Sequence, residues 1–140
     1  MHKGFNPSGV WHPRGRGFSM AVAQAEGQVV HFTGQVAWDE NENIVGRGDI
    51  EAQTRQCFQN TAAILAALGG TLEDLVSVTT YYTDQSQLPA IQKVRSEVFG
   101  EGYAPTSTSV MVAGLGHEDF LVELAPVAVI PFSRHEPPAD

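Results

Sequence analysis

Residues 48–83 read GDIEAQTRQCFQNTAAILAALGGTLEDLVSVTTYYT, and this stretch decides the class of the fold. Asp49 suits a helix N-cap, because its carboxylate can accept from a free backbone N–H group of the first turn. Apolar and small residues then recur at three- and four-residue spacing as far as Leu68, which predicts an amphipathic helix of about five turns. Gly69-Gly70 ends this helix, and the β-branched and aromatic run Val76–Thr83 is typical of a strand.

The segments on either side continue the alternation of strands and helices. Pro89 suits the first turn of a second amphipathic helix, which Gly100 ends. Pro126 interrupts the last strand, which indicates either a bulge or an edge position. The remaining strand candidates are Ser19–Ala25 and Val29–Thr33, which predict a hairpin around the turn Glu26-Gly27-Gln28, then Ile44-Val45, Thr106–Val112 and Phe120–Ile130.

The resulting order β-β-β-α-β-α-β-β predicts an α+β fold with two helices packed on one face of a mixed sheet. The chain has 140 residues, the size of one domain. We expect a flexible arm over residues 1–17 and a frayed tail over residues 133–140, because both are rich in Pro or polar residues. The second face of the sheet, with residues such as Val29 and Val78, is too apolar to remain exposed to water, which predicts self-association.

Composition limits the classes of partner. The net charge is −8 and the chain has two lysines, Lys3 and Lys93, which argues against nucleic-acid binding. No apolar run approaches the roughly 20 residues that span a bilayer, so we expect no membrane partner. The lone Cys57 and the absence of a signal-like apolar run near the N-terminus favour a cytoplasmic protein.

Few residues carry an obvious chemical signal. The five histidines lack metal-ligand spacing, and we expect no metal site. His117 stands apart because it follows Gly114-Leu115-Gly116 in the loop after a predicted strand. In that strand Ser107, Ser109 and Met111 share one face, since a strand has a period of two. We expect the opposite, valine-containing face to pack on the core, and the serine face to line a small-molecule cleft or a subunit contact.

Several blocks resemble the RidA (YjgF) family between about Phe18 and Pro131. The matching blocks are Thr33–Val36, Gly48–Gln56, Asn60, Val78–Asp84 and Val94–Phe99. The resemblance implies a chorismate-mutase-like fold and a homotrimer with small-molecule clefts between subunits. It also implies hydrolysis of reactive enamines and imines, such as 2-aminoacrylate, to ketones and ammonia without a metal or organic cofactor.

The sequence departs from the family pattern where substrate would bind. The family's arginine, which clamps the substrate carboxylate, falls at Ser107. The family's glutamate, which positions water, falls at Ala125 or Leu124, and Glu123 is the substitute carboxylate that we carry forward. Carried over by position, the other expected cleft residues are Phe18 (in place of a tyrosine), Gly34, Gln92, Tyr103 and Ser109.

Three functions follow from this pattern. The first is hydrolytic deamination of an enamine or imine that lacks a simple α-carboxylate, with Glu123 or His117 as catalytic residues and with little acceleration on 2-aminoacrylate. The second is a non-catalytic small-molecule binder or sensor, which the departures favour. RNA cleavage or inhibition of translation, a label attached to this family, fits worst because the chain is acidic.

Overall fold

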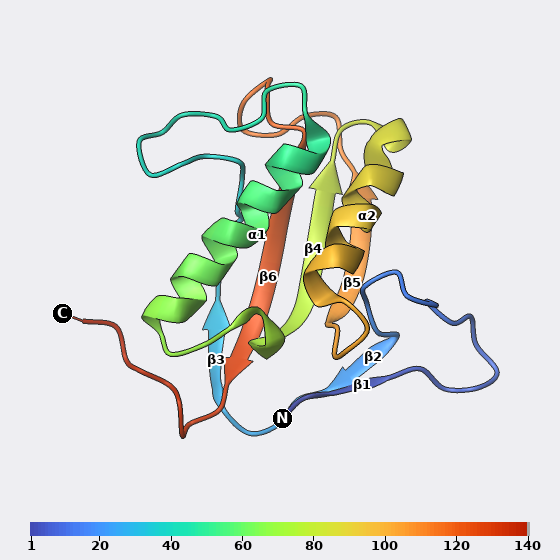
Figure 1. The fold of residues 1–140 in the computed structure, drawn as a ribbon, viewed down its shortest axis with the longest axis vertical. Coiled ribbons are helices and arrows are strands. Elements are labelled where there is room, and N and C mark those ends of the chain that lie inside the picture. Colours follow the sequence, from blue (N-terminus) through green and yellow to red (C-terminus); the bar gives the residue numbers. More distant parts are fainter. Residues whose placement is uncertain (140) are drawn as a thin grey trace.

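The structure, a computed structural model, describes residues 1–139 and places two helices on one side of a four-stranded sheet (Figure 1). The strand order is β3-β6-β4-β5, in which β4 and β5 are parallel and the other neighbours are antiparallel. The predicted α+β class with a mixed sheet is therefore confirmed. The strands are β3 (Gln28–His31), β4 (Leu75–Tyr82), β5 (Thr106–Met111) and β6 (Val122–Ile130).

Both predicted helices form. Helix α1 (Ile50–Ala67) begins after Asp49, whose Oδ1 accepts from the Ala52 backbone N–H at 3.1 Å. Helix α2 (Leu88–Phe99) has Pro89 in its first turn and ends at Gly100, whose φ of 58° is accessible to glycine without strain. Two short 3₁₀ helices, η1 (Leu72–Asp74) and η2 (Gln85–Gln87), precede β4 and α2.

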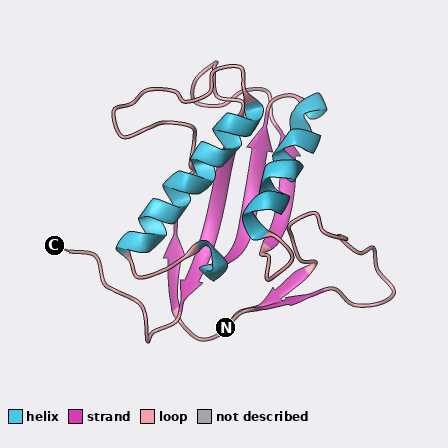
Figure 2. Ribbon diagram, in the orientation of Figure 1, coloured by secondary structure: helices cyan, strands magenta, loops and turns pink. Residues whose placement is uncertain are grey.

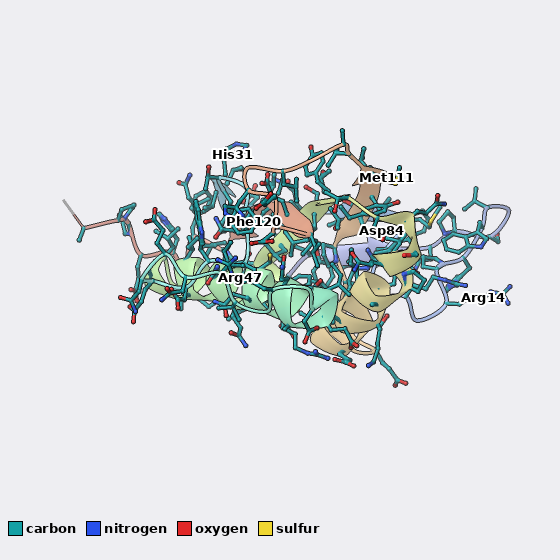
Figure 3. The ribbon with its side chains drawn as sticks, turned by 90° about the horizontal axis from the view of Figure 1, so that it is seen from above. Arg14, His31, Arg47, Asp84, Met111 and Phe120 are labelled. Carbon is teal, nitrogen blue, oxygen red and sulfur yellow. The ribbon has the colours of Figure 1, made fainter. Side chains whose placement is uncertain are left out.

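The core lies between the helix pair and the sheet. Seen from above, α1 and α2 lie together on one side of the sheet, and His31 lies on the other (Figure 3). Phe58 of α1 and Phe99 of α2 meet edge to face with ring centroids 5.7 Å apart. The buried apolar side chains of this layer include Cys57, Leu65, Val78, Tyr82, Ile91, Val94, Val122 and Leu124. Val78 therefore lies in the core between the helices and the sheet. The expectation that it lies on the second face of the sheet is wrong.

The N-terminal residues differ from the prediction. The strand β2 (Ala21–Ala23) pairs with β1 (Lys3–Phe5), whereas β3 pairs with β6, so the predicted hairpin is wrong. His2 joins the two parts: its Nδ1 accepts from the Ala25 N–H at 3.0 Å, and its Nε2 bonds to the Val129 carbonyl at 2.7 Å. The chain therefore enters the main sheet only at β3, after β2, and the contacts of His2 that hold the two sheets together are long-range contacts that no local sequence pattern predicts.

Both terminal segments contact the rest of the chain. Residues between β1 and β2 form a long loop beside β5, which we call the arm (Figure 2). The tail is tied to the end of α1, since the Glu136 N–H donates to the Leu68 carbonyl at 3.0 Å. Arg134 donates to both carboxylate oxygens of the buried Asp74, at 2.7 and 3.1 Å. Arg134 and Glu136 are thus hydrogen-bonded to residues near the end of α1 and in η1.

Pro126 lies within the central strand β6, so the edge alternative is wrong. On the β3 side of β6, the Leu124 N–H donates to the Gln35 carbonyl. Pro126, two residues on, faces the same side, where residues 32–34 leave the ladder between β3 and Gln35. The missing N–H of Pro126 therefore has no ladder partner to lose. A register shift also occurs opposite this strand, between Leu75 and Ser77 of β4.

Candidate functional site

Two side-chain amides of the block at residues 48–60, those of Gln53 and Asn60, hydrogen-bond to backbone groups of neighbouring loops. Gln53 is fully buried, and its Nε2 donates to the carbonyls of Gly46 (3.1 Å) and Asp119 (2.8 Å). Its Oε1 accepts from the Leu121 N–H at 2.9 Å. Asn60 donates to the carbonyls of Val36 and Trp38. The most distinctive motif of the sequence is therefore structural, because its amides satisfy loop groups that would otherwise be buried unpaired.

Glu123 and Gly34 meet on the face of the sheet that the helices leave open. In β6, Glu123 lies opposite Tyr81 of β4, and its side chain is half-buried. The Glu123 carboxyl group occupies the space where a Cβ at Gly34 would be. Ala125 follows on the same face, opposite Thr79. The Glu123 carboxylate therefore lies against the backbone at Gly34. Glu123 is the substitute carboxylate proposed from the sequence.

The two faces of β5 are reversed relative to the prediction. Ser107 and Ser109 lie in register with Val78 and Thr80, which are buried beneath the helices. The face that carries Val110 looks the opposite way, and Val110 is 39% exposed. The expectation that the valine face packs on the core is wrong, because the register with β4, and not the polarity of β5 itself, sets which face the helices cover.

Arg95 of α2 brings a guanidinium group to Ser107. The side chain is buried at 3% exposure, and its Nη1 donates to the Ser107 hydroxyl at 2.9 Å. Its Nε donates to the Arg16 carbonyl of the arm at 3.1 Å, and its Cζ lies 5.0 Å from the centre of the Phe18 ring. Burial lowers the pKa of Arg95 to about 10.

Sequence reasoning missed Arg95, although a signal was present. Arg95 is four residues after Ile91 and next to Val94, on the apolar stripe of the second helix. A cation on a buried stripe calls for an explanation, since arginine is almost never fully buried without a partner. Arg95 of α2 therefore places a positive charge beside β5, next to the position where Ser107 replaces the family's arginine.

The other expected site residues make their contacts with other parts of the chain. The Tyr103 hydroxyl donates to the Leu75 carbonyl at 2.6 Å, and its ring lies 6.0 Å from that of His2. The exposed His117 accepts from the Asp119 N–H at 3.0 Å and meets the edge of Phe120, contacts that shape its own loop. Gln92 lies on α2 one turn before Arg95.

Two cavities lie near the arm and the N-terminus. One of about 180 Å³ lies under the arm and is lined by His12, Arg14, Gly17, Phe18 and other residues. The second, of about 270 Å³, is lined by His2, Tyr103, Arg134 and their neighbours. Neither of these two cavities is lined by Glu123 or Gly34.

Metal and thiol chemistry have little support in residues 1–139. This part of the chain holds no group of three or more His, Cys, Asp or Glu side chains able to bind a metal ion. Cys57 is fully buried, and burial together with the negative Glu123 raises the pKa of its thiol to about 12. The thiol is therefore protonated and unreactive at neutral pH. None of the helices described has the length and hydropathy of a membrane span.

Comparison with known proteins gives a consistent result. The family described as Endoribonuclease L-PSP matches residues 13–130. A 3-aminoacrylate deaminase, RutC, of Acinetobacter baylyi is 37% identical over 100 residues, which cover 71% of this chain and 78% of that protein. A RutC family protein of Pyrococcus horikoshii is 35% identical over 102 residues, which cover 73% and 79%.

The solved structures agree with the sequence comparison. YyfB of Yersinia pestis, a member of the conserved Rid protein family, superposes with a TM-score of 0.86 at 30% identity. The match covers 92% of this chain and 98% of that one. The similarity therefore includes almost all of the secondary structure described above.

Proposed function

The chain belongs to the RidA (YjgF) family, and from this premise we propose that it catalyses the hydrolytic deamination of a small enamine or imine. In this reaction water adds to the C=N carbon of the imine, nitrogen is protonated, and ammonia leaves to give a carbonyl product. An enamine first takes a proton on carbon to become the imine. The observation that carries the proposal is the Glu123 carboxylate held against Gly34 on the open face of the sheet.

Glu123 is the proposed general base. A carboxylate within hydrogen-bond reach of a bound water can accept its proton during attack and return it to the leaving nitrogen, an effect of about 10²–10⁴ in rate. Gly34 matters because any side chain there would take the place of the Glu123 carboxyl group. His117 remains a second proposed proton-transfer residue, although its contacts lie within its own loop and do not include Glu123.

The proposed substrate lacks a simple α-carboxylate. Strands β4, β5 and β6, all within the described residues, contain no Lys or Arg, so these strands offer no fixed positive charge beside Glu123. A charge-assisted hydrogen bond contributes about 1.5–3 kcal/mol, and without it a carboxylate substrate would bind weakly. The setting that we propose for this chemistry is the cytoplasm.

A homotrimer would complete the site. The open face and the β5 edge expose apolar side chains, among them Val29 (41%), Val110 (39%) and Met111 (55%). Self-association would cover them and would enclose Glu123 in a cleft between subunits. Light scattering should give a mass about three times the 15.1 kDa of one chain. A monomer would contradict the intersubunit cleft.

The activity is tested with three imine or enamine substrates. We expect little acceleration for 2-aminoacrylate and 2-iminobutyrate, generated by a dehydratase, and we include 3-aminoacrylate because RutC is named for it. An active substrate should be sought among small imines without an α-carboxylate. Glu123→Gln should then lower kcat by about 100-fold, whereas Glu118→Gln in the exposed loop should not. Equal rates for the two variants would exclude Glu123 as the base.

A non-catalytic binder or sensor is the second candidate. The observation that favours it is Arg95, whose guanidinium lies beside Ser107 but is covered by the arm and does not face Glu123. In that case no imine would be hydrolysed faster than in buffer, and a small molecule would still bind. RNA cleavage remains the weakest of the three proposals, since the net charge is −8.

A further inference from the structure

The N-terminal segment, residues 1–25, is basic although the chain as a whole is acidic. It contains three of the eight Lys and Arg residues, Lys3, Arg14 and Arg16, and none of the sixteen Asp and Glu residues. With histidines neutral, its net charge is therefore +3, whereas residues 26–140 carry −11. Unlike charges thus lie on separate parts of each copy, which favours attraction between copies.

The cations of this segment also lack anionic partners. Each exposed cation in the rest of the chain pairs with a carboxylate, and these cations are Arg47, Arg55, Lys93 and Arg134. In contrast, Lys3, Arg14 and Arg16 make no ion pair with a carboxylate of residues 1–139. The Arg16 guanidinium instead donates to the Pro13 carbonyl and lies 5.2 Å from the centre of the Trp11 ring. The charges of this segment are therefore available to carboxylates of another molecule.

Exposed apolar side chains lie on the same segment. Phe5, Val10 and Trp11 are each more than half exposed, and Met20 is 39% exposed. Aromatic side chains, Met and Arg together are typical of protein–protein contacts, and an exposed apolar patch bordered by charges marks an interaction site. The family match begins only at residue 13, so most of this surface lies outside the part of the chain that the family shares.

The arm within this segment has a defined shape. The Trp11 ring stacks on Phe18 with ring centroids 6.0 Å apart. The Arg14 N–H donates to Nδ1 of His12 at 2.9 Å, which fixes the turn at the tip of the arm. Ser19 attaches the end of the arm to the body, because its N–H donates to the backbone carbonyl just before β5 at 2.9 Å. An ordered segment loses little conformational entropy on binding, which favours a docking role.

Negative charge is concentrated in the turn at residues 39–42, which we call the acidic turn. Asp39 accepts from backbone N–H groups nearby, whereas Glu40 and Glu42 pair with no cation of residues 1–139. Together with Trp38, which is 41% exposed, the turn lines a hollow of about 440 Å³. In Figure 1 the acidic turn lies at the upper left and the arm at the lower right, so they cannot meet within one chain.

We propose that the arm of one copy docks on the acidic turn of a second copy, with Arg14 against Glu40, Glu42 and Trp38. Figure 3 shows Arg14 at the outer edge of the molecule, where it can pair with carboxylates and lie over an aromatic ring of a neighbour. Because the two surfaces differ, the contact is head to tail, and repeating it closes a ring or continues as a filament. An anionic membrane fits less well, since it would repel the acidic remainder of the chain.

Cross-linking with a carbodiimide tests the contact, because this reagent joins an amine only to a carboxylate that touches it. The full-length variant Arg14→Lys keeps the charge and supplies the amine. Isotopically light and heavy chains of this variant are mixed equally in urea and refolded together. We expect the substituted lysine to couple to Glu40 or Glu42, with about half of the products joining a light to a heavy chain. Lys93 is the internal control, since it contacts Glu51 of its own chain at 2.7 Å and should give single-label products.

Variants in the same background test the receiving surface. Glu40→Gln together with Glu42→Gln should lower the yield of mixed-label product at least about tenfold, because an amide neither couples nor attracts the amine. Glu136→Gln in the exposed tail is the matched control and should leave the yield unchanged. Raising sodium chloride from about 20 mM to about 500 mM should lower the yield several-fold, since salt screens exposed charges.

The outcomes separate clearly. The absence of mixed-label product at the substituted lysine, or an equal amount of it at Lys93, would overturn the docking of the arm on a second copy. An unchanged yield after the two glutamate substitutions would overturn the acidic turn as the receiving surface. Sedimentation with phosphatidylglycerol vesicles, without mixed-label product, would assign the arm to a membrane instead. No turnover is measured and the open face of the sheet is not probed, so the result is independent of the proposed catalysis.

Discussion

Gln53 and Arg95 are both polar side chains buried between a helix and the same face of the sheet, but they are satisfied differently. Gln53 is neutral and makes three hydrogen bonds to backbone groups of two loops. Arg95 is charged, has two neutral acceptors and faces no carboxylate among the described residues. The satisfied amide of Gln53 holds loops in place, whereas the charge of Arg95 is buried without a compensating carboxylate among the described residues.

The largest effect on stability should follow Gln53→Ala. The change leaves two carbonyls and one N–H group without partners, and each such buried group costs about 1–3 kcal/mol. We expect the free energy of unfolding, measured with urea, to fall by about 3 kcal/mol or more. Gln59→Ala on the exposed side of the same helix is the control and should change it by less than about 0.5 kcal/mol. Equal effects of the two variants would contradict the structural role of Gln53.

Cys57 offers an intermediate case, a buried ionisable group that is kept neutral. Its folded-state pKa of about 12 lies above the value of 9.0 for a free thiol, so the thiol stabilises the fold below pH 9 and this contribution is lost as the pH rises toward 12. Between pH 9 and 11, the free energy of unfolding should fall more steeply than in Cys57→Ala, by about 1.4 kcal/mol per pH unit. Parallel curves would show that the thiol already ionises in the folded protein.

The smallest effect should follow Arg95→Met. Replacing a buried charge by an apolar side chain of similar length removes the desolvation penalty, so the free energy of unfolding should stay within about 1 kcal/mol of the parent protein or rise. Urea unfolding measures this directly. A loss of about 3 kcal/mol would instead show that Arg95, like Gln53, is a structural residue.

The sequence and the structure agree where local pattern is strong. The cap at Asp49, the helix that ends at Gly69-Gly70 and the strand after it all form as predicted, because capping and periodicity act over a few residues. The structure places Glu123, the substitute carboxylate chosen from the sequence, next to Gly34.

The errors share one cause, since each concerns a contact between distant segments. The predicted hairpin failed because β1, far from β3 in sequence, pairs with β2, and His2 anchors that pair. The faces of β5 were exchanged because register with β4 decides them. In both cases the local sequence was compatible with either arrangement, and the partner strand selected one.

The sequence by itself determined the elements, their order and the family, since these depend on periodicity, caps and a long specific motif. Only the tertiary structure decided which side chains share a site. Arg95 and Ser107 are twelve residues apart, on a helix and a strand, and they meet because α2 packs across β5. The same packing separates Ser107 from Glu123, since the faces of a sheet are assigned by register and by the layer that covers them.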